Sequence, residues 1–220
     1  GRIEVFESRW PPRPLMKRNP KVLAVVGARP QFVKAAALHR AWLQSPWRNR
    51  IRLIWLHTGQ HYDPLLSDIF FEQFKLPAPQ FRLQPGTGVG LSQMTRIMEG
   101  MQQPLTEERP DLVVVFGDTN STLAAALAAS MEKIPVAHVE AGIRSYNADM
   151  PEERNRVLTD HLSCMRFCPS ASSLRNLESE GLTQGNYKVG DIMADVLRIT
   201  RRGIRRKDED YYVATIHRNT

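Results

Sequence analysis

The 220-residue chain contains only two cysteines, and it has no hydrophobic run approaching the roughly 20 residues of a membrane-spanning helix. Two cysteines are too few for a disulfide-stabilised scaffold. Cys164 and Cys168 also lack the paired spacing of a zinc site. We expect both to be reduced thiols in a core. No signal-peptide pattern, internal repeat or low-complexity segment is evident, so we predict a globular, cytoplasmic protein that makes no contact with membranes.

The basic residues are not distributed along the chain as a nucleic-acid-binding protein would require. The formal net charge is +7, but twelve basic residues lie in residues 1–21 and 198–207. The rest of the chain holds slightly more acidic than basic residues, without aromatic residues interleaved among the bases. We therefore expect no nucleic-acid partner. The run at 198–207 is better interpreted as a solvated helix end, where cations suit the helix dipole.

Short apolar segments alternate with amphipathic ones along most of the chain. The pattern predicts strands at 21–26, 50–57, 81–84, 111–116, 135–140, 166–168, 187–190 and 211–217. It predicts helices at 31–44, 64–74, 91–107, 119–131, 151–163, 170–181 and 191–202. Strand–helix alternation of this kind is typical of a parallel Rossmann-like sheet with helices on both faces, an α/β fold.

Three segments are expected from the distribution of these elements. Residues 1–15 are proline-rich and lack apolar periodicity, so we exclude them from the fold as an upstream or artificial extension. Residues 16–203 form a Rossmann-like catalytic domain. Residues 204–220 form a linker and a first strand that leads into a further domain.

Polar and ionisable residues follow nearly every predicted strand. Because ligands of open parallel sheets bind at the carboxyl ends of the strands, we expect these residues to converge on one edge. The candidates are Arg29 and Lys34 after the first strand, Gln60 and His61 after the second, Asp118 after 111–116, Glu140 and Arg144 after 135–140, Glu152 at the next helix start, and His217 after the last strand.

Several of these residues also have purely structural interpretations. Asp118 could cap the helix that follows it. Glu152 and Glu153 could be first-turn acids that complement a helix dipole, and Arg29 could be a surface residue. Glu140 is harder to explain in this way, because it continues an apolar strand and a partly buried carboxylate usually has a partner or a function. The glycine-rich loop at 86–90 does not have the spacing of a dinucleotide fingerprint.

Six motifs in consistent order resemble the non-hydrolysing UDP-N-acetylglucosamine 2-epimerases. They are VVGARPQFVK, HTGQHYD, VVFGDTNSTLA, VAHVEAGIRSYN, MPEERNR and ATIHR, and they run from Lys21 to Arg218. The resemblance implies the first half of a two-domain fold like that of B-type glycosyltransferases, with the active site between two Rossmann-like halves. It also implies that the second half supplies most of the uridine and diphosphate contacts, so the 220 residues alone should be inactive.

The same resemblance implies an isomerase that converts UDP-GlcNAc to UDP-ManNAc by eliminating and re-adding UDP. Asp118, Glu140 and Glu152 match the essential carboxylates of the family, and His217 matches the histidine at the departing diphosphate. Arg29, Lys34, Gln60, His61 and Arg144 are implied as substrate-binding residues. No metal or other cofactor is implied, and the expected assembly is a homodimer in polysaccharide biosynthesis.

Two sequence details bear on the substrate and its regulation. The GARPQF and DTNST segments resemble the branch that acts on UDP-2,3-diacetamido-glucuronate. Family members that are regulated by a second substrate molecule usually carry Arg after the Gln-His pair of this loop. Here Tyr62 and Asp63 follow Gln60-His61. We therefore expect allosteric activation to be weak or absent. A B-type glycosyltransferase and a non-enzymatic nucleotide-binding module remain as alternatives. The first needs an acceptor, and the second tolerates loss of Glu140.

Overall fold

The structure is a computed structural model that describes residues 19–60, 71–84, 90–200, 212 and 214. Its centre is an all-parallel, seven-stranded sheet with the strand order β3-β2-β1-β4-β5-β6-β7. The strands are β1 (Lys21–Val26), β2 (Arg52–His57), β3 (Phe81–Arg82), β4 (Leu112–Phe116), β5 (Val136–Val139), β6 (Met165–Cys168) and β7 (Asn186–Lys188). The α/β fold and parallel sheet predicted from the sequence are confirmed.

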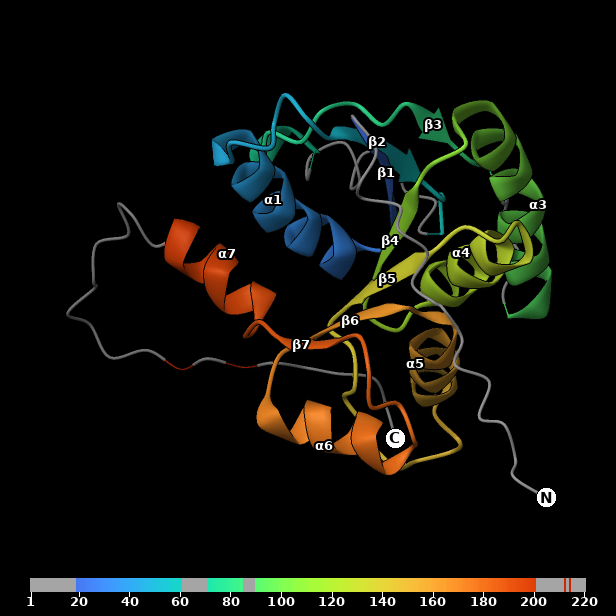
Figure 1. Ribbon diagram of the computed structural model, residues 1–220, viewed down its shortest axis with the longest axis vertical. Helices are drawn as coiled ribbons and strands as arrows, with labels where there is room; N and C mark the ends of the chain where they lie inside the picture. Colours follow the sequence, from blue (N-terminus) through green and yellow to red (C-terminus); the bar gives the residue numbers. More distant parts are fainter. Residues whose placement is uncertain (1–18, 61–70, 85–89, 201–211, 213, 215–220) are drawn as a thin grey trace, which may run out of the picture.

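Helices cover both faces of the sheet. They are α1 (Arg29–Gln44), α3 (Leu91–Glu108), α4 (Asn120–Met131), α5 (Pro151–Leu162), α6 (Ala171–Ser179) and α7 (Ile192–Thr200). Figure 1 shows α1 and α7 on one side of the sheet, with α3, α4 and α5 on the other. No helix among the described residues is long and apolar enough to cross a membrane.

Alternate residues of the central strands pack into two separate hydrophobic cores, one on each face of the sheet. Leu23, Val113 and Val115 pack with α3 and α4, while Ala24 and Phe116 pack on the opposite face with Phe32 of α1. Because both faces of each strand are buried, the strands read as continuous apolar runs rather than alternating ones. Both cysteines are free and buried, as the sequence predicted, and burial raises the pKa of the Cys168 thiol to about 11.

The predicted elements agree with the structure to within a few residues at their ends. The helix predicted at 91–107 runs to Glu108 with Pro104 inside it. The strand predicted at 81–84 is only two residues long. Most of the predicted helix at 64–74 and strand at 211–217 fall outside the described residues.

Candidate functional site

The sheet changes its winding direction between β1 and β4, which are hydrogen-bonded neighbours in the sheet although α1, β2, β3 and α3 separate them in the chain. From these two strands, α1 leads to one face and α4 to the other. Diverging connections leave a crevice at the carboxyl ends of the strands, the usual ligand site of open α/β sheets. At this point Gly27 is required by close packing, because a Cβ there would overlap the hydroxyl oxygens of Thr58 and Ser121.

Gln31 joins the two sides of the crevice. Its Oε1 accepts hydrogen bonds from the backbone nitrogens of Gly27 (2.6 Å) and Ala28 (3.0 Å). Its Nε2 donates to the carbonyl of Phe116 (2.7 Å) and to Thr122 Oγ1 (2.9 Å). The buried amide therefore fixes the turn after β1 against the turn after β4. This arrangement fixes the position at which Asp118 leaves the sheet.

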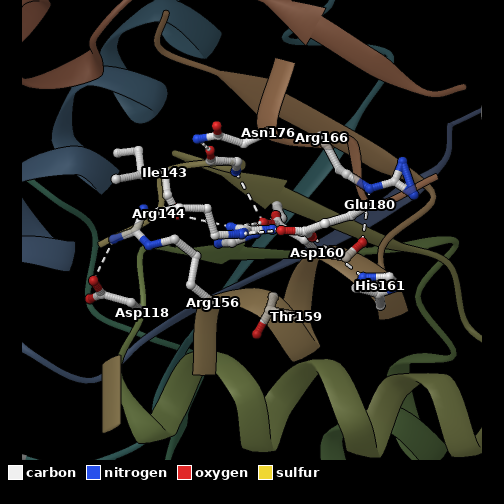
Figure 2. Close-up of polar contacts among 12 residues, drawn as sticks. Asp118, Ile143, Arg144, Arg156, Thr159, Asp160, His161, Arg166, Asn176 and Glu180 are labelled. Carbon is white, nitrogen blue, oxygen red and sulfur yellow. Dashed lines mark hydrogen bonds and ion pairs between the residues drawn. The ribbon is translucent and has the colours of Figure 1, made fainter. Parts of the chain in front are cut away.

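Asp118 is not the cap of α4. Thr119 occupies that position, and its side chain accepts a hydrogen bond from the backbone nitrogen of Thr122. The Asp118 carboxylate instead forms an ion pair with Arg156 of α5, as Figure 2 shows. Asn155 Nδ2 donates to the Asp118 carbonyl over 2.9 Å, so α5 holds both the backbone and the side chain of Asp118. The capping interpretation is wrong, and the Asp118 carboxylate can serve another role.

Glu140 directly follows β5 in a conformation that non-glycine residues seldom adopt. Its φ is +71°, and strained backbone of this kind is concentrated at functional sites. The carboxylate pairs with Lys34 of α1, a buried lysine. A Cβ on Gly117 would lie 3.2 Å from Lys34 Nζ and 3.5 Å from Glu140 Oε2, so the pair lies directly beside the turn that precedes Asp118.

Arg156 links these two carboxylate-bearing turns. One guanidinium nitrogen pairs with Asp118, while Nη1 donates to the carbonyl of Glu140 over 2.7 Å. Lys34, Asp118, Glu140 and Arg156 thus form one set of contacts, which we call the carboxylate cluster. It contains two acids and two bases, and both acids retain some solvent exposure. Two carboxylates from different strand ends, each held by a cation, are suited to proton transfer on a bound substrate.

Glu152 and Glu153 both occupy the first turn of α5, as their structural interpretation predicted. Glu152 precedes Arg156 by four residues, so the two share one face of the helix. Glu153 turns to the loop before α5, where its carboxylate accepts from the backbone nitrogens of Ser145 and Tyr146. Partial burial alone would raise the pKa of Glu153, but these hydrogen bonds outweigh it and leave the pKa lowered.

Arg144, predicted to bind substrate, has its guanidinium buried against two acids in the structure. Its side chain is 1% exposed, with Nη1 lying 2.7 Å from Asp160 Oδ2. Its Nε and Nη2 donate to Glu180 over 2.6 and 2.8 Å, as seen in Figure 2. Burial by itself would lower the pKa of Arg144, but Glu180 and Asp160 raise it. A guanidinium held in this way is not available to a ligand in the crevice.

The remaining predicted residues are divided between described and undescribed parts of the chain. Arg29 is exposed at the first turn of α1, where it is accessible to an anion. Gln60 contacts α4 instead of facing a free crevice, because its Oε1 accepts from Ser121 Oγ over 2.6 Å. His61 and His217 lie outside the described residues.

Three residues that complete the site were not predicted from the sequence. Arg156 belongs to the MPEERNR segment, and its spacing of four from Glu152 is a signal for a shared helix face. His138 interrupts an apolar strand predicted to be buried, and a buried polar group needs partners. Asp160 carries no signal of its own. Its role depends on contacts with His138 and Arg144, which lie elsewhere in the sequence.

A groove of about 710 Å³ lies between α1 and α7 on one face of the sheet, over strands that include β1, β4, β5 and β6. Its lining is mostly apolar, with Leu38, Ile51 and Phe167 among its residues, and it shares only Glu140 with the carboxylate cluster. An apolar lining does not match the phosphates of a nucleotide. We therefore place the candidate site at the carboxyl edge of the sheet.

Comparison with known proteins identifies relatives of this chain. The chain is 42% identical over 209 residues to a UDP-N-acetylglucosamine 2-epimerase homolog of Methanococcus maripaludis, covering 90% of this chain and 57% of the relative. It is also 42% identical over 207 residues, with the same coverage of both chains, to the UDP-2,3-diacetamido-2,3-dideoxy-D-glucuronate 2-epimerase of Pseudomonas aeruginosa. The chain therefore spans little more than half the length of these relatives.

A solved structure shows the same fold. The UDP-GlcNAc 2-epimerase of Methanocaldococcus jannaschii, in complex with UDP-GlcNAc and UDP, matches with a TM-score of 0.77 and 40% identity. The match covers 83% of this chain and 51% of that one. The sequence profile of the UDP-N-acetylglucosamine 2-epimerase family matches residues 46–220. The chain therefore belongs to the UDP-N-acetylglucosamine 2-epimerase family.

Proposed function

We propose that the intact protein inverts C2 of a UDP-N-acetylhexosamine, converting UDP-GlcNAc to UDP-ManNAc by elimination and re-addition of UDP. One observation carries the proposal. Asp118 and Glu140 leave different strands of the sheet, and Arg156 binds both turns at the carboxyl edge. Inversion needs a proton removed from one face of C2 and returned to the other, and two separately mounted carboxylates meet that need.

The proposed reaction has two steps. One carboxylate takes the proton from C2, the C–H electron pair forms the C1–C2 double bond, and the C1–O bond breaks to release UDP. The intermediate is a 2-acetamidoglucal. In the second step a UDP oxygen attacks C1, and an acid on the opposite face protonates C2. Each acid or base of this kind typically contributes about 10²–10⁴-fold to the rate.

Other residues of the edge have supporting roles in this proposal. Arg29, exposed at the start of α1, is suited to the charge that grows on the diphosphate as the C1–O bond breaks. Lys34 holds the Glu140 carboxylate directly and so fixes its position at the edge. Glu152 is the third candidate carboxylate. His217 and His61 are proposed from the family resemblance to contact the substrate.

The resemblance also carries proposals about the whole protein. We propose that a second domain supplies most of the UDP contacts, that the protein acts as a cytoplasmic homodimer, and that its product enters polysaccharide biosynthesis. The 220 residues alone should then have no turnover, since holding both reacting groups together is worth about 7–11 kcal/mol. Light scattering of the intact protein tests the dimer.

A second substrate has a specific observation in its favour. The Pseudomonas aeruginosa relative named for UDP-2,3-diacetamido-2,3-dideoxy-D-glucuronate is as similar to this chain as the archaeal homolog. The intact protein should therefore be incubated with each UDP-sugar, without any acceptor, and the sugar protons followed by NMR. A C2 epimer from either substrate supports the proposed reaction and identifies the preferred sugar. If neither substrate gives an epimer, or if turnover requires an acceptor, the proposed reaction is contradicted.

A further inference from the structure

A buried histidine lies next to the carboxylate cluster and has no role in the proposed chemistry. His138 is the third residue of β5 and is 0% exposed. Its Nδ1 lies 2.7 Å from Asp160 Oδ1, and its Nε2 lies 2.7 Å from the carbonyl oxygen of Gly117. Both ring nitrogens therefore have a partner at normal hydrogen-bond distance.

The Gly117 carbonyl fixes the direction of one of these contacts. A backbone carbonyl can only accept a hydrogen bond, so Nε2 must donate to Gly117. Asp160 Oδ2 accepts from the backbone nitrogen of Gly142 (3.0 Å) and lies 2.7 Å from Arg144 Nη1. Asp160 is therefore held by other groups and anchors the ring at Nδ1.

Further buried contacts hold Asp160 in place. Arg144 also pairs with Glu180, and Arg166 of β6 donates from Nε to the Asp160 carbonyl over 2.8 Å. The ring of His138 therefore lies against a fixed carboxylate.

We infer that His138 acts as a positioning residue for Asp118 by binding the Gly117 carbonyl. The effect on turnover rests on the proposed function, whereas the contact with Gly117 does not. Gly117 is in the left-handed region, with φ +65°, and its nitrogen donates to the Val139 carbonyl over 3.0 Å. His138 holds the other end of the same residue, so both peptide groups flanking Gly117 are fixed.

The link to Asp118 is a single peptide bond. The Gly117 carbonyl belongs to the peptide unit whose nitrogen is that of Asp118, so a rotation of this unit moves the start of the Asp118 side chain. Glycine resists such a rotation less than any other residue. Losing the His138 contact should displace Asp118 relative to Glu140, and a displacement of about 1 Å at a reacting group can cost about 100-fold in rate.

The contact is tested on the intact protein labelled with nitrogen-15 histidine. His138→Asn identifies the His138 signals by their loss, since the asparagine side chain carries no ring. We expect a one-bond proton coupling on Nε2 of His138, because the Gly117 carbonyl can only accept a hydrogen bond. An Nε2 without a proton would overturn the inference, whether or not the protein is an epimerase.

The positioning role is tested by steady-state kinetics of His138→Asn with UDP-GlcNAc, since the shorter amide does not reach the Gly117 carbonyl. We expect kcat to fall about 10- to 100-fold while KM stays within about threefold, because the ring does not contact the sugar nucleotide. His161→Asn, at a half-exposed histidine of α5, should leave both constants unchanged. An unchanged kcat in folded His138→Asn overturns the positioning role. Absence of turnover in the wild type counts against the proposed function instead, and the NMR result still decides whether Nε2 holds the Gly117 carbonyl.

Discussion

Single side chains at the carboxyl edge hold groups that are distant in sequence. Arg156 is the clearest case, since one guanidinium contacts the Asp118 carboxylate and the Glu140 carbonyl. A planar fork of donors can serve two acceptors at once, which the compact ammonium of lysine cannot. At the residue scale, the geometry of the site therefore depends on cations that do not react themselves.

Arg156→Lys keeps the positive charge but removes the fork. We expect kcat to fall about 100-fold, because only one of the two turns can remain held and a displaced carboxylate transfers protons poorly. Steady-state kinetics on the intact protein measures this. Arg154→Lys, two residues earlier on the exposed side of α5, is the matched control and should be neutral. A kcat for Arg156→Lys within about threefold of the wild type would contradict the role.

The strained backbone of Glu140 leads to a prediction about the stability of two variants. Glu140→Ala and Glu140→Gly both remove the carboxylate, so both should lose nearly all turnover. They differ in backbone freedom, because glycine adopts φ near +71° without the penalty that alanine incurs. We expect Glu140→Gly to be about 1 kcal/mol more stable to urea unfolding than Glu140→Ala. Equal stabilities, or a more stable alanine variant, would show that the conformation carries no strain.

Elements are joined at the crevice by buried polar contacts as well as by the apolar cores. Gln31 of α1 reaches the end of β4 and the first turn of α4. The sequence predicted α1, β4 and α4 to within two residues at each end, because local periodicity defines them. It did not predict this link, since Gln31 and Phe116 are 85 residues apart. Pairings of this kind depend on the order of strands in the sheet.

Gln31→Met should weaken the joint between α1 and α4. Methionine fills a similar volume but leaves the Gly27 and Ala28 nitrogens without their buried acceptor. Each unsatisfied buried group costs about 1–3 kcal/mol, so we expect a loss of about 3 kcal/mol in the free energy of unfolding. Urea denaturation measures it. Gln102→Met, on the exposed face of α3, should change the stability by less than about 0.5 kcal/mol.

Asp160 joins α5 to β5 and to the turn that contains Arg144. Burial alone would raise its pKa, but the hydrogen bond and charge of His138, then those of Arg144, leave the pKa below its ordinary value of 3.8. A carboxylate with a lowered pKa in the folded state stabilises the protein above its unfolded-state pKa. This stabilisation is lost as the pH falls through the lower, folded-state pKa.

Asp160→Asn should therefore cost about 3 kcal/mol at pH 7, because it leaves buried cations without their partner. The wild type should lose stability steeply below about pH 4, and the variant less steeply there. Thermal unfolding of both proteins between about pH 3 and pH 7 measures the two curves. Parallel curves would mean that Asp160 does not carry the acid sensitivity.

At the scale of the whole molecule, the sequence predicted that polar strand ends would converge, and for the described residues they do. It did not predict that Lys34 pairs with Glu140 or that Arg144 is buried against Asp160. The reason is physical. Parallel strands place their ends on one edge whatever the partners, but which cation meets which carboxylate depends on side-chain packing between residues as many as 106 positions apart.

The central claim is that Asp118 and Glu140 move a proton at C2 of a UDP-sugar. The most direct test is turnover of UDP-GlcNAc by the intact protein in D₂O, followed by NMR, with Asp118→Asn, Glu140→Gln and the exposed control Asp149→Asn compared with the wild type. We expect the wild type and Asp149→Asn to give product labelled with deuterium at C2, and the other two variants to turn over at least about 100-fold more slowly. Product without deuterium at C2, or rates within about tenfold of the wild type for both cluster variants, would contradict the account.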